Sequence, residues 1–169
     1  MAELTPRERL QPSLLDRLTD DAPSEAQEAR ERRVLSMRAL RQGVLRDLAW
    51  LLNTTNLGSM QDLSAYPETA RSVVNYGLPD LTGKTASGLE VPELERRLRD
   101  AICEFEPRIL RHTVAVRAIA GGGDSNNTLV FEVSGELWAQ PVPERLFLRT
   151  ELDLEVGEVR VADLAQVRA

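Results

Sequence analysis

Few residues of the kinds that carry out catalysis occur in this 169-residue chain. His112 is the only histidine and Cys103 is the only cysteine. A Cys–His nucleophile pair would need these two to meet across a bend between a helix and a strand, and one residue of each kind cannot make a zinc site. Cys103 lies on the flank of an apolar helical face, where we expect it to act as a small hydrophobic residue.

Paired carboxylates are more frequent than these. Glycoside hydrolysis needs two carboxyl groups roughly 5 to 10 Å apart. The candidates are Glu104 with Glu106, and Glu136 with Glu144. No aromatic-lined sugar cleft is indicated, because the only tryptophans, Trp50 and Trp138, sit in strongly apolar patterns. The sequence therefore gives hydrolysis little support.

Two glycine-containing segments fall short of nucleotide-binding motifs. Gly83-Lys84-Thr85 resembles the end of a P-loop, but that motif needs a glycine five positions before Gly83, where Leu78 stands. The run GGGDSNN, from Gly121 to Asn127, lacks the spacing of a dinucleotide fingerprint and precedes no helix. We expect a solvated loop at the first segment and a hairpin loop, of open role, at the second.

The segment Glu106-Pro107-Arg108 combines opposite charges with a rigid backbone. A residue that precedes proline is disfavoured in the helical region, so the preceding helix must end by Glu106. In an extended segment residues i and i+2 project to the same side, so we expect Glu106 and Arg108 side by side on a stiff elbow. Two interpretations stay open. One is a surface ion pair that stabilises the turn by about 0–1 kcal/mol, and the other is a preorganised docking element for a partner's charges.

The elements that position this elbow change in type near residue 106. Before it, apolar residues recur at helical spacing and predict helices from residue 24 or 30 to 52, over about 67–76, and over 92–105. Leu10, Leu14 and Leu18 predict a further helix, so short that it must dock on another surface.

After residue 106 apolar and polar residues alternate. This pattern predicts strands over 113–119, 129–137, 145–155 and 158–161, with one face of the sheet buried. The fold class that follows is α+β, with N-terminal helices packed on one face of a C-terminal antiparallel β-meander of about four strands. We expect an N-terminal docking segment and linker over 1–29, the α+β domain over 30–162, and a C-terminal tail over 163–169.

Composition excludes several classes of protein. The net charge of −6 argues against a general affinity for nucleic-acid phosphates. The chain has no apolar run near 18 residues, and its first ten residues, MAELTPRERL, lack a signal stretch. One cysteine cannot form an internal disulfide. We expect a cytoplasmic protein without cofactor or metal, whose core is aliphatic because aromatic residues make up only 4% of the chain.

Several segments, in order along the chain, resemble a known family. They are LQPSLLDRLTDD (10–21), LAWLLNT (48–54), SVVNYGLPDLTG (72–83), FEPR (105–108) and GELWAQPVPERLFLRTELDLEVGEV (135–159). Together they look like the baseplate-wedge family of contractile injection machines, the TssE family of the type VI secretion baseplate. The resemblance covers roughly residues 10–161, and the related short baseplate protein of contractile-tailed phages often carries a "lysozyme-like" label.

The resemblance implies a structural subunit with no enzymatic activity. Such proteins join the wedge subunits TssF, TssG and TssK, at the cytoplasmic side of the inner membrane, where the sheath of TssB and TssC begins to polymerise. The family's Glu-Pro-Arg motif falls on Glu106, Pro107 and Arg108, which are then interface residues. The marginal helix with Leu10, Leu14 and Leu18 would dock on a wedge partner, and a closing strand would offer an edge for an added strand. The label leaves a peptidoglycan-cleaving hydrolase as the alternative.

Overall fold

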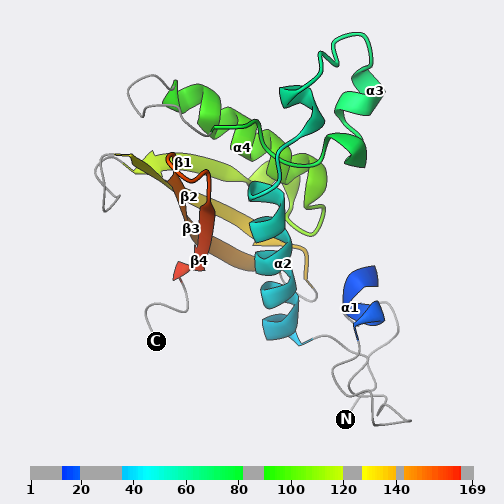
Figure 1. Cartoon of the computed structure of the whole chain (residues 1–169). Helices are drawn as coiled ribbons and strands as arrows, with labels where there is room; N and C mark the ends of the chain where they lie inside the picture. Colours follow the sequence, from blue (N-terminus) through cyan, green and yellow to red (C-terminus); the bar gives the residue numbers. More distant parts are fainter. Residues whose placement is uncertain (1–12, 20–35, 82–89, 120–126, 140–142, 165–169) are drawn as a thin grey trace, which may run out of the picture.

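The computed structural model describes residues 13–19, 36–81, 90–119, 127–139 and 143–164. Helices precede a sheet, as the sequence predicts (Figure 1). The α-helices are α1 (Leu14–Leu18), α2 (Met37–Leu52), α3 (Pro67–Ala70) and α4 (Val91–Phe105). Short 3-10 helices are η2 (Leu57–Ser59), η3 (Val73–Asn75) and η5 (Arg111–Thr113). The strands are β1 (Ala115–Ile119), β2 (Thr128–Leu137), β3 (Glu144–Asp153) and β4 (Val159–Asp163).

The four strands form one antiparallel meander in the order β1-β2-β3-β4. In β2 and β3 buried and partly exposed residues alternate, because successive side chains of a strand point to opposite faces of the sheet. Leu148 of β3 lies opposite Val133 of β2, and both are buried. The predicted α+β class and the single buried sheet face are therefore confirmed.

Helices α2 and α4 pack against the sheet, with α2 next to β4 and α4 next to β1 (Figure 1). Their apolar stripes, such as Leu48 of α2 and Leu98 of α4, enter one core with the inner side chains of the strands. Of the buried core residues described, only Phe131 is aromatic. The predicted aliphatic core is confirmed. No helix among the described residues is long and apolar enough to cross a membrane.

The predicted helix over 67–76 is wrong beyond its first turn. It divides into α3 and η3, because side chains bind the backbone in place of the helical ladder. The Ser72 hydroxyl accepts a hydrogen bond from the Val74 amide, and the Asn75 amide group donates to the Ala70 carbonyl. Val73 is 81% exposed, so no buried face holds this segment helical.

Gly77 ends this segment at a position that requires glycine. Its φ is +119°, and a Cβ there would lie 2.2 Å from the Thr54 carbonyl oxygen. The close approach lets the Leu78 amide donate to the Thr54 carbonyl at 2.8 Å and the Leu78 carbonyl accept from the Asn56 amide at 2.9 Å. Gly77 thereby returns the chain to the end of α2.

A buried arginine on α2 joins this helix to two strands. Arg41 is 8% exposed and binds both carboxylate oxygens of Asp163, through Nε and, at 2.8 Å, through Nη2. Its Nη1 donates to Glu144 Oε1 at 2.9 Å and to the Arg145 carbonyl at 3.1 Å. The hydrogen bonds that Arg41 donates to Asp163 contribute most to raising the pKa of Arg41, against the opposing effect of burial. The guanidinium therefore stays charged inside the protein.

Side chains bond outward backbone groups of both edge strands. On β1 the Ala118 amide donates to Glu95 Oε1 of α4 at 2.6 Å. On β4 the Asn53 side chain, at the end of α2, bonds both the amide and the carbonyl of Val159 at 2.8 Å. Because the outward backbone groups of an edge strand recur at every second residue, Val161 is the next residue of β4 to present its N–H and C=O outward.

Removing one member of the Arg41 group should cost far more than removing a surface pair. We expect Asp163→Ala to lower the free energy of unfolding by about 3–5 kcal/mol, because it leaves a buried guanidinium without its main partner. Denaturant unfolding measures the change. The matched control is Arg160→Ala on the same strand, whose pair with Glu158 is exposed and 3.7 Å long. It should shift stability by at most about 0.5 kcal/mol, and equal losses for the two variants would contradict the assignment.

Candidate functional site

The elbow at Glu106-Pro107-Arg108 connects α4 to the sheet. Helix α4 ends at Phe105, and Glu106 is its C-cap. The backbone angles of Glu106 are φ −120° and ψ 78°, outside the helical region as expected before proline. The Arg108 carbonyl accepts from the Trp138 amide at 2.7 Å, and the Leu110 amide donates to the Glu136 carbonyl at 2.8 Å. The elbow is thereby bonded to the end of β2.

Glu106 and Arg108 lie side by side, as predicted, but they are not a surface pair. Arg108 Nε donates to Glu106 Oε1 at 2.7 Å, and Arg108 Nη2 donates to Glu106 Oε2 at 2.5 Å. Glu106 is only 3% exposed. The interpretation as an exposed turn-stabilising pair is wrong, because the side chains point into the protein and not out from the turn. Whether these residues also contact a partner stays a prediction.

The same guanidinium reaches across to α2. Arg108 Nη2 donates to Asp47 Oδ2 at 2.5 Å, so one cation joins carboxylates from the elbow and from the middle of α2. Burial acts to lower the pKa of Arg108, but the hydrogen bonds and charges of Glu106 and Asp47 outweigh it and raise that pKa. Tyr76 lies beside them, and burial followed by the charges of Asp47 and Glu106 raises the pKa of its phenol.

Two further charges extend this group to α1. Arg46 donates from Nε to Asp47 Oδ1 at 2.8 Å and from Nη1 to Asp16 Oδ1 at 2.7 Å. Asp16 also completes a capping box with Ser13. Burial raises the pKa of Asp16, but the hydrogen bond from Ser13 and the ion pair with Arg46 bring it below its ordinary value. We call the five charged residues, Asp16, Arg46, Asp47, Glu106 and Arg108, the elbow network.

The elbow network closes over α2 at Gly43. A Cβ at Gly43 would lie 3.5 Å from Asp16 Oδ2 and 3.6 Å from Arg108 Nη1. The bare backbone of the helix therefore faces an aspartate from α1 and the arginine of the elbow at the same point. Segments far apart in the sequence meet here: the N-terminal helix, α2 and the turn after α4.

The N-terminal leucines behave only in part as predicted. Leu10 lies outside the described residues. Leu14 and Leu18 are in α1 and are 72% and 74% exposed, so the apolar face of α1 points to solvent while Asp16 holds the helix to α2. Trp50 of α2 is also half exposed, contrary to its apolar sequence pattern, and the Arg46 guanidinium lies 5.2 Å from its ring centroid.

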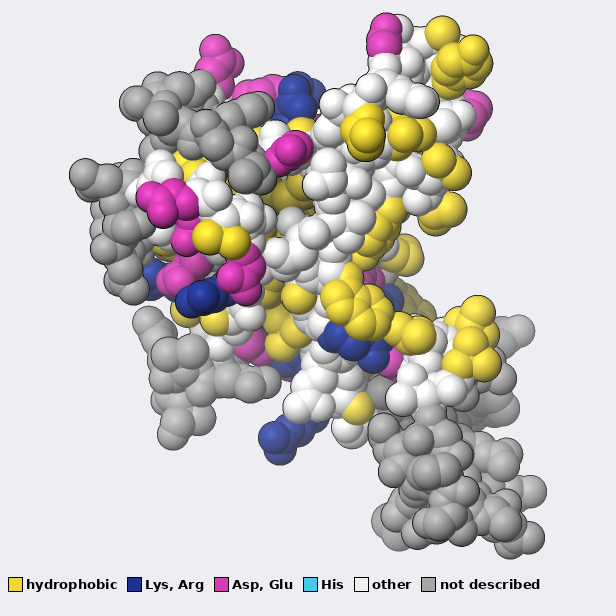
Figure 2. All heavy atoms as spheres, viewed as in Figure 1, with side chains coloured by type: hydrophobic (Ala, Val, Ile, Leu, Met, Phe, Trp, Pro, Cys, Tyr) yellow, Lys and Arg dark blue, Asp and Glu magenta, His cyan; other side chains and the backbone are white. Residues whose placement is uncertain are grey.

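Hydrophobic side chains gather over α1 and the neighbouring part of α2 (Figure 2). We call Leu14, Leu18 and Trp50 the α1–Trp50 surface. An isolated exposed leucine needs no explanation, but large apolar side chains that gather on one face are typical of an interaction site.

The other candidate residues do not assemble into a catalytic site. Burial raises the pKa of the Cys103 thiol, and its sulfur lies 3.7 Å from the Arg111 carbonyl oxygen. Glu136 of β2 lies opposite Arg145, and Glu144 of β3 lies opposite Leu137. The two glutamates are therefore one position apart along the ladder and project to opposite faces of the sheet. Within the described residues no three His, Cys, Asp or Glu side chains could hold a metal ion.

The remaining sequence candidates are either engaged or outside the described residues. Glu104 accepts from Arg111 Nη2 at 2.9 Å, away from Glu106, whose carboxylate binds Arg108. Residues 83–85 and most of the GGGDSNN run lie outside the described residues. The Trp138 ring is half exposed, again contrary to its apolar pattern.

Sequence reasoning missed the residues that complete these charge groups. Asp47 and Arg46 precede Leu48 in what reads as an ordinary polar face, and Asp16 stands among the leucines of α1. The position of Arg41 in the sequence did indicate a buried charge. It directly follows Leu40 within the apolar stripe of α2, where a charged residue can be accommodated only with a buried partner.

Comparison with known proteins gives one match. A family model described as baseplate wedge protein gp25 matches residues 38–142, which run from the start of α2 through the elbow and β2 to five residues beyond Leu137. No curated protein and no solved structure matches the chain significantly.

Neutralising the buried carboxylate of the elbow should loosen its contact with α2. We expect Glu106→Gln to lower the free energy of unfolding by about 2–3 kcal/mol, because Arg108 loses its bidentate partner while the side-chain volume is unchanged. Glu104→Gln is the control two residues away, where the carboxylate is partly exposed and pairs with exposed arginines. It should cost at most about 1 kcal/mol. Equal losses of unfolding free energy for the two variants would show that the Glu106 carboxylate stabilises the fold no more than the partly exposed Glu104 does.

Proposed function

The chain belongs to the family of baseplate wedge protein gp25, which is the family of TssE, and we propose that it serves as a non-enzymatic wedge subunit of a type VI secretion baseplate. Members of this family are structural components of baseplates. In the proposed role the protein links the wedge subunits TssF, TssG and TssK, and it helps the TssB–TssC sheath to start assembling. It would do so at the cytoplasmic side of the inner membrane.

The observation that carries this proposal is the extent of the family match. It includes α2, α4, the elbow and β2, which are the elements joined by Asp47, Arg108 and Glu106. The carboxylates considered for hydrolysis are engaged instead: Glu106 by Arg108, and Glu144 by Arg41. No observation on the described residues favours the peptidoglycan hydrolase, so the adaptor is the function we propose.

We further propose that the α1–Trp50 surface binds another wedge subunit. Leu14 and Leu18 are exposed on a helix of five residues, which would be unstable alone and is attached to α2 by Asp16. The boundaries expected from the sequence agree with this role, with 1–29 as docking segment and linker, 30–162 as the body and 163–169 as the tail. The elbow residues Glu106, Pro107 and Arg108 would support the interface by fixing the position of α2.

The N-terminal surface can be tested by co-purification with TssF and TssG. The variant Leu14→Glu with Leu18→Glu should keep its unfolding midpoint, because both side chains are exposed, but should lose at least tenfold in recovered complex, equivalent to about 1.4 kcal/mol. Deletion of residues 1–22 should act in the same way. The control is Val156→Glu, which places one such charge at a site that is 71% exposed in the turn before β4. Undiminished recovery of the leucine variant would sink the N-terminal proposal.

Peptidoglycan hydrolysis measured in parallel tests the other half of the proposal. We expect none from the unmodified protein. If the unmodified protein hydrolyses peptidoglycan and the folded Glu106→Gln variant does not, the proposed adaptor function is wrong and the hydrolase is supported. Because Glu106 is also a stability residue, each variant is compared at a temperature where its circular dichroism matches that of the unmodified protein.

The role in sheath assembly is proposed for the outer edge of β4. Val161 follows the position clamped by Asn53 and presents its backbone groups outward, where a strand from a sheath protein could pair. Val161→Pro should remove the outward N–H without breaking the ladder with β3, since proline is tolerated where the N–H of an edge strand faces solvent. Sheath assembly should then fail, while Val161→Ala, which keeps the N–H, should assemble. Normal sheaths with folded Val161→Pro would contradict the proposal.

A further inference from the structure

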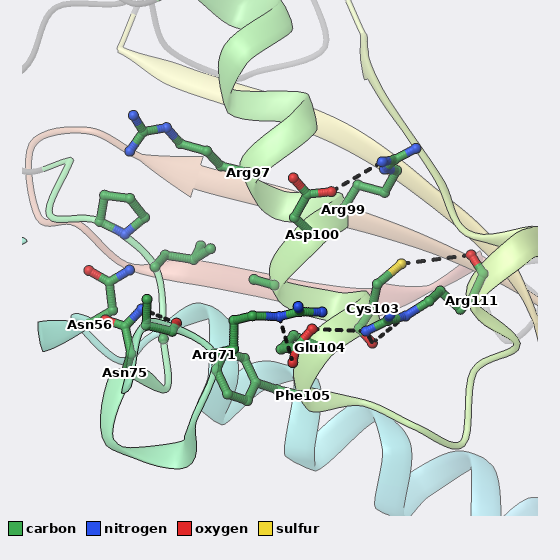
Figure 3. Close-up of a pocket in the computed structure, with 15 residues that line it drawn as sticks. Asn56, Arg71, Asn75, Arg97, Arg99, Asp100, Cys103, Glu104, Phe105 and Arg111 are labelled. Atoms are coloured by element: carbon green, nitrogen blue, oxygen red, sulfur yellow. Dashed lines mark hydrogen bonds and ion pairs between the residues drawn. The ribbon is translucent and has the colours of Figure 1, made fainter. Parts of the chain in front are cut away.

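A groove of about 680 Å³ lies between α4 and the chain that follows α3 (Figure 3). Its apolar lining includes Leu78, Ala101 and Phe105. Phe105 is fixed by an edge-on contact with Tyr76, at 5.3 Å between ring centroids. The groove thus has a packed aromatic side chain in its wall, and the residues of the α1–Trp50 surface and of the β4 edge are not among its lining.

The groove is cationic although the protein as a whole is acidic. Four arginines line it: Arg71, Arg97, Arg99 and Arg111. Among the described residues the lining includes two carboxylates, Asp100 and Glu104, and Glu93 outside it pairs with Arg97. The lining therefore carries an excess of positive charge, in a chain whose net charge is −6. Such a local reversal of sign favours negatively charged ligands at this surface.

Both carboxylates of the groove are already paired with its own arginines. Glu104 accepts from Arg111 and lies 3.8 Å from Arg71, and Asp100 accepts from Arg99 at 3.1 Å. In Figure 3, Arg71, Glu104 and Arg111 lie together at one end of the groove, and Arg97 lies at the other. A guanidinium has five N–H donors in a planar fork, so these arginines retain donor capacity for further carboxylates.

We propose that this groove binds an acidic, extended segment of a partner protein. Carboxylates of the segment would pair with Arg71 and Arg97 at the two ends, and an apolar side chain between them would lie against Phe105. A small inorganic anion would not use the apolar wall, and the acidic remainder of the protein opposes a nucleic acid. The proposal does not depend on the type VI assignment, because it concerns one surface and one class of ligand.

Fluorescence anisotropy on the full chain tests this with two labelled peptides. The probe is a fluorescein-labelled peptide of glutamate, leucine and serine, on the order of ten residues so that its extended length exceeds the groove. The comparison peptide has glutamine in place of every glutamate. We expect binding of the acidic peptide that weakens as salt is raised, and at least tenfold weaker binding of the glutamine peptide.

Neighbouring arginines on α4 give a matched pair of variants. Arg97 and Arg96 both bind Glu93 and are similarly exposed, but only Arg97 lines the groove. Arg97→Glu and Arg71→Glu should each weaken binding of the acidic peptide about tenfold, while Arg96→Glu should leave it within twofold. Unchanged unfolding midpoints establish that the variants are folded.

Three results would overturn the proposal. They are no binding of the acidic peptide, equal binding of the glutamine peptide, and equal effects of Arg96→Glu and Arg97→Glu. Competition separates the remaining ligand classes: if inorganic phosphate or a short DNA duplex displaces the peptide in an Arg97-dependent manner at equal concentration, the groove is a general anion site and the proposal fails.

Discussion

The cost of burying a guanidinium governs how this small protein is assembled. An unpaired buried charge costs several kcal/mol, so the buried Arg41 and the partly buried Arg108 each require carboxylates from the segments that surround them. Arg41 takes Asp163 from the last strand, and Arg108 takes Glu106 from the elbow and Asp47 from α2. Helix α2 contributes the arginine to one group and the aspartate to the other. Its position is therefore fixed by charge pairing at two points as well as by its apolar stripe.

This arrangement changes what the Glu-Pro-Arg segment can contribute to an assembly. The Glu106 carboxylate is enclosed, and the Arg108 side chain retains only 23% exposure. A partner cannot reach the glutamate unless the pair opens. The segment is then better understood as the residue set that fixes α4, α2 and β2 relative to one another, so that surfaces elsewhere on the protein keep a constant geometry. A subunit that joins several others benefits from such rigidity, because ordering a surface during binding reduces affinity.

Periodicity predicted the parts of the fold that depend on burial of apolar faces. The stripes of α2 and α4 and the alternation in β2 and β3 were sufficient, because each side chain there contacts the common core. Glu106 does lie beside Arg108, but in a turn closed by the Ile109 amide on the Glu106 carbonyl and not in the extended segment that the prediction assumed. Proline geometry could not reveal that Asp47 lies opposite them, because that contact joins residues 61 positions apart. The helix over 67–76 failed for a related reason: Ser72 and Asn75 form local hydrogen bonds that a pattern of apolar residues does not register.

Both edges of the sheet are held by side chains of the adjoining helical segments. Glu95 of α4 accepts from the Ala118 amide of β1, and Asn53 after α2 bonds the amide and the carbonyl of Val159 of β4. The outward backbone groups of an edge strand are a template on which other chains can pair. The residues that attach the helices to the sheet therefore also occupy some of these groups, and they oppose unintended pairing with other chains at both edges.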